Sequence, residues 1–152
     1  MKSNSYVKFA AMMTVSFVIM YAVMFLNADI FEHVMLSTTR TYMTILMVAP
    51  MAISMILFMW KMYENKKINY IILTSAVIIF IGTLAMLRNQ TLIADVQWMK
   101  AMIPHHSSAI MVSQKAHLLD PEAQKLAEDI IKAQKEEIAQ MQEMIKRLEA
   151  KN

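Results

Sequence analysis

Cysteine is absent from this chain of 152 residues, and glycine and proline are scarce, with one and three copies. Without cysteine the chain has no disulfide framework, no thiolate metal site and no thiol nucleophile. The small number of turn-forming residues, together with 57% hydrophobic residues, favours long helices over a sheet. We therefore expect an all-α protein.

A concentrated basic surface is also missing. The formal net charge is +3, and residues 89–152 contain eight Lys or Arg against nine Asp or Glu. Nucleic-acid binding depends on clustered positive charge that neutralises phosphates. We therefore expect no nucleic-acid partner.

The first 90 residues contain three long apolar stretches. Twenty uncharged, mostly apolar residues occupy each of 9–28, 41–60 and 68–87. At ~1.5 Å per residue each stretch is about 30 Å long as a helix, which matches the hydrocarbon thickness of a bilayer. Helix is the expected state because the backbone in lipid must satisfy its own hydrogen bonds. We predict a three-helix transmembrane anchor over residues 1–88, in contact with membrane lipid.

Positive charge predicts the orientation of this anchor, because cytoplasmic loops carry the excess of Lys and Arg. The N-terminus and the second loop share one side of the membrane and carry five lysines, and the other side carries two arginines: Lys2, Lys8, Lys61, Lys66 and Lys67 against Arg40 and Arg88. We expect a multi-pass protein of the cell (inner) membrane with a cytoplasmic N-terminus. After three spans, the C-terminal part is then extracytoplasmic.

Residues 89–152 are amphipathic and predict an antiparallel helical hairpin. A first helix is expected over 92–118. Asp120 as N-cap and Pro121 at the first helical position then start a second helix that runs to about Lys151, and the short turn makes the two helices antiparallel. A hairpin of this size buries little core alone, so we expect it to form a homodimer or higher homo-oligomer, most simply a four-helix bundle.

The first helix of the hairpin carries a His-His pair among methionines. On a helix, Met102 and either His105 or His106 fall on one face, although Pro104 kinks or starts the helix at this point. Imidazole and thioether are soft donors that suit Cu(I), with Ag(I) as a chemical relative, better than Mg, Ca or Mn. This stretch is the strongest candidate for a metal site.

The facing helix carries four polar or sulfur-containing side chains within two turns, which could complete the site or orient the imidazoles: Gln134, Glu137, Met141 and Met144. The structural alternative is that the histidines are hydrogen-bonded core residues and that most of the 18 methionines fill apolar space. His33, with Met35 nearby, is expected to be a loop residue, with an accessory ligand role as the alternative.

Two elements of the hairpin, in order, resemble domain-of-unknown-function family 305: Met102-Ile-Pro-His105-His106-x-x-Ala109-x-x-x-Ser113 and Leu126-Ala-x-x-Ile130-Ile131-x-Ala133-Gln134-x-x-Glu137-Ile138-x-x-Met141. The resemblance covers about residues 94–148, and the first 90 residues resemble the membrane-anchored branch of the family. It implies a ferritin-like helical fold, of which a single hairpin is half a four-helix bundle. It also implies extracytoplasmic copper binding and copper or silver resistance.

Carried over residue by residue, the resemblance gives Met102, His105, His106, Met111 and Met141 as candidate metal ligands. We expect a membrane-anchored extracytoplasmic Cu(I) or Ag(I) binding protein that acts in copper handling by ligand exchange and catalyses no reaction. A copper transporter or chaperone is a further expected partner. The alternative is a non-metal helical interaction module that docks on a membrane partner such as a metal transporter. A di-iron oxidase is disfavoured, because no Glu is followed three residues later by His.

Overall fold

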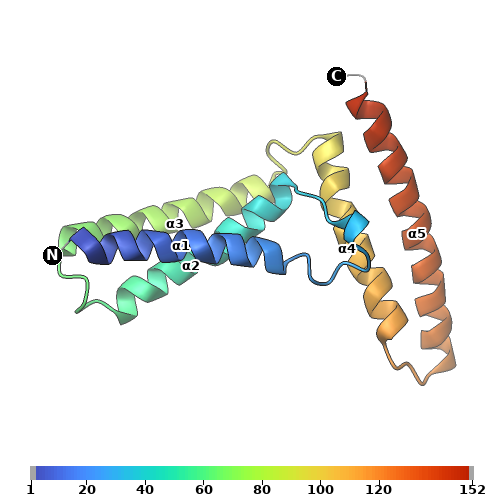
Figure 1. The fold of residues 1–152 in the computed structure, drawn as a ribbon, viewed down its shortest axis with the longest axis horizontal. Helices are drawn as coiled ribbons and strands as arrows, with labels where there is room; N and C mark the ends of the chain where they lie inside the picture. Colours follow the sequence, from blue (N-terminus) through green and yellow to red (C-terminus); the bar gives the residue numbers. More distant parts are fainter. Residues whose placement is uncertain (1–2, 151–152) are drawn as a thin grey trace. The chain divides into compact units, whose positions relative to one another are not determined.

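The regular elements in the computed structural model, which describes residues 3–150, are all helices, and this confirms the all-α prediction (Figure 1). The five α-helices and one short 3-10 helix are α1 (Ser3–Val23), η1 (Phe31–His33), α2 (Thr38–Phe58), α3 (Lys66–Arg88), α4 (Asp95–Lys115) and α5 (Pro121–Glu149). The chain divides into two compact units. One contains residues 1–23 and 40–91, and the other contains residues 24–39 and 92–152.

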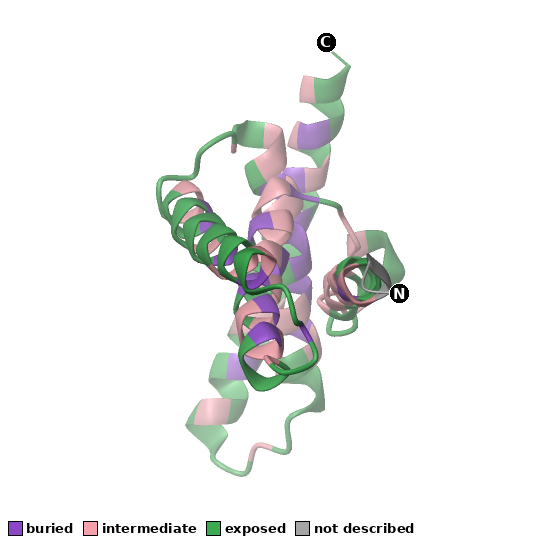
Figure 2. Cartoon of the chain, turned by 90° about the vertical axis from the view of Figure 1, so that its left-hand side faces the viewer, coloured by how far each residue is buried: buried purple, intermediate pink, exposed green. Residues whose placement is uncertain are grey.

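In the first unit, α1, α2 and α3 are each long and apolar enough to cross a membrane. Many residues of these helices are exposed (green in Figure 2), and the exposed apolar ones include Val18 at 61% and Ile78 at 64%. Surfaces of this kind are the ones that a bilayer covers. A helix was predicted over the whole of the first apolar stretch, to residue 28, but α1 ends at Val23.

A polar cluster holds α1 and α3 together at the N-terminal end of each helix. The Tyr6 hydroxyl donates to Asn69 Oδ1 at 2.8 Å and accepts the Asn65 backbone N–H at 3.2 Å. The Asn69 side chain is fully buried, and its amide donates to the Tyr63 carbonyl at 2.7 Å. Both ends of this buried amide are therefore hydrogen-bonded, as a polar group in an apolar core requires.

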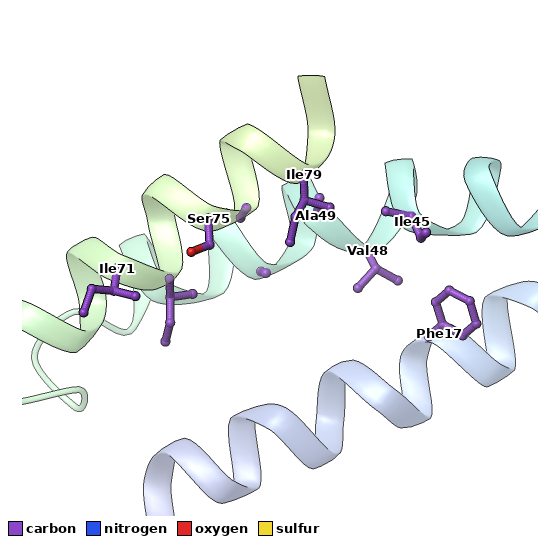
Figure 3. Close-up of a pocket in the computed structure, with 10 residues that line it drawn as sticks. Phe17, Ile45, Val48, Ala49, Ile71, Ser75 and Ile79 are labelled. Carbon is purple, nitrogen blue, oxygen red and sulfur yellow. The ribbon is translucent and has the colours of Figure 1, made fainter. Parts of the chain in front are cut away.

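A cavity of about 480 Å³ opens between α1, α2 and α3 (Figure 3). Its lining is apolar except for Ser75, and consists of Phe17, Ile45, Val48, Ala49, Ala52, Ile71, Ile72, Ser75, Ala76 and Ile79. The lining contains no histidine, methionine or charged side chain. The candidate metal ligands therefore lie elsewhere.

In the second unit, α4 and α5 form the C-terminal hairpin that the sequence predicts. Asp120 Oδ1 accepts the Ala123 N–H at 2.9 Å, and Pro121 opens α5, so the predicted start signal is confirmed. Lys100 Nζ lies 2.7 Å from Glu149 Oε1, which joins the beginning of α4 to the end of α5, as antiparallel helices require. The two helices enclose an apolar cluster of buried residues: Met99, Ile103, Ile110, Ile138, Met141 and Ile145.

The segment 24–39, between α1 and α2, is hydrogen-bonded to α4 near both of its ends. The Asn27 amide donates to Ser108 Oγ at 2.8 Å. The Thr38 N–H and hydroxyl both donate to Gln97 Oε1 at 3.0 Å. These contacts add to the hairpin a segment that the sequence did not assign to it. The division into residues 1–88 and 89–152 remains a prediction.

Candidate functional site

α4 runs without interruption through Pro104, so this proline does not start a helix. The two adjacent histidines point in different directions from this helix. His106 is buried at 9% exposure, whereas His105 is exposed, and their ring centroids are 6.1 Å apart. Helical spacing also predicts that Trp98, four residues before Met102, shares the inward face, but Trp98 is 49% exposed and its neighbour Met99 is buried instead.

The His106 ring is fixed by two oxygen atoms. Nδ1 lies 3.0 Å from the Met102 carbonyl oxygen, which can only accept, so this nitrogen carries a proton. Nε2 lies 2.6 Å from Glu137 Oε2 on α5. When both ring nitrogens carry a proton, the ring donates to both oxygens and forms an ion pair with the carboxylate. Because Nδ1 is committed to the backbone, Nε2 is the nitrogen that could bind a metal ion.

Thioethers lie one turn from this His–Glu pair on both helices. Met102 is four residues before His106 on α4, and Met141 is four residues after Glu137 on α5. Because the helices run antiparallel, these equal steps lead to about the same level of the hairpin. A further step of three residues leads to Met99 and Met144, and all four methionines belong to the apolar cluster or pack against it.

We call this arrangement the His–Met ladder. It has three levels, which are His106 with Glu137, Met102 with Met141, and Met99 with Met144. Among the described residues, no group of three His, Asp or Glu side chains is placed to hold a metal ion. The donors that the hairpin brings together are therefore one imidazole and several thioethers, which is a soft set.

Two of the predicted ligands lie outside the ladder. The His105 side chain is exposed and makes no hydrogen bond to any residue from 3 to 150. Met111 is half-buried and is not part of the apolar cluster, because its position is turned by about 100° around α4 from that of Ile110, which is buried in the cluster. Sequence reasoning did not select Met99, whose spacing of seven residues before His106 places it on the same face.

A third histidine approaches α4 from the segment between α1 and α2. Ser107 Oγ is fully buried; it accepts the Asp29 N–H at 2.8 Å and lies 2.8 Å from His33 Nδ1. Burial lowers the pKa of His33 below its ordinary value, and the carboxylates of Asp29 and Glu32 oppose this shift. In the sequence, only the nearby Met35 singled out His33, and nothing local indicated its contact with Ser107.

The fold defines an all-α class of protein, with three helices of membrane-spanning length and a C-terminal helical hairpin. Residues 82–145 match the family described as Domain of unknown function (DUF305). An uncharacterized protein of Acanthamoeba polyphaga mimivirus is 34% identical over 137 residues, which is 88% of each chain. No solved structure matches the chain. The protein belongs to the DUF305 family, as the motifs of the hairpin indicated.

Proposed function

We propose that this protein is a membrane-anchored Cu(I)-binding protein that also takes Ag(I), and that it contributes to copper handling outside the cytoplasm. The observation that carries the proposal is the His–Met ladder. It contains one imidazole, whose Nδ1 faces a backbone carbonyl, and thioethers one helical turn away on two helices, in or against an apolar cluster. Soft donors of this kind favour Cu(I) over hard cations.

In the proposed site, His106 Nε2, Met102 and Met141 hold the ion. The Glu137 carboxylate occupies Nε2 in the metal-free chain, but its side chain is 52% exposed and is therefore free to turn away toward water. His105, exposed and one residue earlier, is the imidazole that meets an ion arriving from solvent. Met111 then serves as an outer thioether only. Transfer proceeds by exchange of ligands and makes or breaks no covalent bond in the protein.

The anchor keeps this site at the membrane surface. The three apolar helices span the bilayer in our proposal, with the lysine-rich side in the cytoplasm and the hairpin outside. The hairpin still exposes Leu119 at 92% and Leu126 at 60%. A second copy that covers these side chains would give the four-helix arrangement of a ferritin-like bundle.

The test is a Cu(I) titration of the full-length protein in lipid nanodiscs, with bicinchoninate as the competing chelator. We expect stoichiometric binding by the wild type. The double variant His105→Gln, His106→Gln should bind at least about tenfold more weakly, a loss of about 1.4 kcal/mol or more. His117→Gln is the matched control, because His117 is exposed in the connection between α4 and α5.

X-ray absorption at the copper edge adds an independent measurement. We expect both nitrogen and sulfur neighbours in the wild type and a loss of nitrogen in the double variant. Failure of the wild type to bind, or equal binding by the double variant and the control, would refute the proposal. The hairpin would then be better described as an interaction module.

A further inference from the structure

We infer that the segment joining α1 and α2 supplies a further ligand to this site, the thioether of Met35. The inference rests on the proposed function. It follows from one juxtaposition, in which Met35 packs against the apolar cluster that α4 and α5 enclose. The match to the DUF305 family begins only at residue 82, so the segment lies outside the region that defines the family.

Hydrogen bonds on both sides of Met35 fix its position along α4. His33, two residues before it, lies 2.8 Å from Ser107, and Thr38, three residues after it, is bonded to Gln97. Met35 is therefore held beside the part of α4 between these two contacts. That part carries Met102 and Met99, which are the α4 members of the second and third levels of the His–Met ladder.

A hairpin of two helices surrounds a bound ion from two sides only. The segment 24–39 adds a third side, and Met35 is its one sulfur-containing residue in contact with the cluster. Its side chain is half-buried, as are those of Met102 and Met144, so it borders the cluster without filling its centre. Four soft donors from three segments, His106 and Met102 on α4, Met141 on α5 and Met35, would then hold the ion within one chain, with no ligand from a second copy.

The competing explanation is that Met35 only fills space. Replacement by leucine separates the two roles, because leucine conserves the apolar volume and removes the sulfur. The variant Met35→Leu in the full-length protein is therefore the test. Met12→Leu is the matched control, since Met12 lies on α1 in the other unit and is 41% exposed.

We expect Met35→Leu to lower Cu(I) affinity about tenfold in the bicinchoninate titration and to remove about one sulfur neighbour per copper, whereas Met12→Leu changes neither. The metal-free variant should keep the wild-type melting temperature within a few degrees. Unchanged affinity and sulfur number in a folded Met35→Leu variant would overturn this inference. If the His105, His106 double variant still lost binding, the proposed function would stand. Absence of binding by the wild type would instead refute the proposed function.

A second readout uses Ag(I), which resists redox change, with the protein labelled at its methionine methyl groups. We expect the Met35 methyl resonance, assigned by its loss in Met35→Leu, to shift together with those of Met102 and Met141. A Met35 resonance that stays in place while the other two shift would also overturn the inference.

Discussion

The hydroxyl of Ser107 is the contact on which docking of the segment 24–39 most depends. It is fully buried, it accepts the Asp29 N–H, and it contacts His33 Nδ1, both at 2.8 Å. Ser107→Ala removes this hydroxyl and therefore both contacts at once. Each hydrogen bond contributes about 0.5–1.5 kcal/mol net, so docking should weaken by about 1–3 kcal/mol.

This loss predicts a measurable change in local opening. At about 1.4 kcal/mol per factor of ten, the open population of the segment should rise about 5- to 150-fold. Amide hydrogen exchange followed by mass spectrometry, on peptides that cover residues 24–39, reports this population directly. Helix α5 should keep its protection from hydrogen exchange, because its apolar cluster with α4 is unchanged.

The control is Ser113→Ala, on the same helix. The Ser113 hydroxyl makes no hydrogen bond within residues 3–150. Alanine is a better helix former than serine by up to about 0.7 kcal/mol, and the control carries the same gain. If Ser107→Ala and Ser113→Ala exchange at the same rate over residues 24–39, the reasoning that this hydroxyl docks the segment is refuted.

Two further predictions concern the same unit. Burial lowers the pKa of His33, so the docked segment favours the neutral ring. Docking in the metal-free protein should therefore be strongest above pH about 6.5 and should weaken as the pH falls below that value. It should stop changing once the ring is protonated in both the docked and the open segment. Protection factors over residues 24–39 measure this, and a His33→Gln variant with the same pH dependence would contradict it. Glu137→Ala removes the group that occupies His106 Nε2, so Cu(I) affinity should rise about two- to tenfold; a fall would instead identify Glu137 as a ligand.

Local sequence signals were sufficient for the helices. The helix bounds were less exact, because the first hairpin helix was predicted over 92–118 and α4 is Asp95–Lys115, and because the first apolar stretch continues to residue 28, past the end of α1 at Val23. The residues that follow are bonded to α4, and Asn27 contacts a serine 81 positions away in the sequence. The local pattern of residues around either position does not indicate a contact between residues so far apart in the sequence.

The candidate site was predictable in composition and only partly in geometry. Helical periodicity placed Met102 with one of the two histidines but left open which one, since adjacent residues differ by about 100° around a helix. Packing against α5 resolved this, because His106 Nε2 contacts Glu137 Oε2 on α5, whereas His105 is exposed to solvent. Met144 was already a candidate from its spacing on the second helix of the hairpin, whereas Met99 joined the site only once the packing of the two helices was known.

The sequence alone determined the three apolar helices, the turn at Asp120 and Pro121, and the presence of soft donors on the hairpin. These properties depend on length, hydrophobicity and spacing along one helix, which are local quantities. Tertiary structure decided which imidazole faces inward, which thioethers share its level, and that the first loop packs on α4. Those properties depend on the rotation and register of one segment against another, and many side chains distant in the sequence set them together.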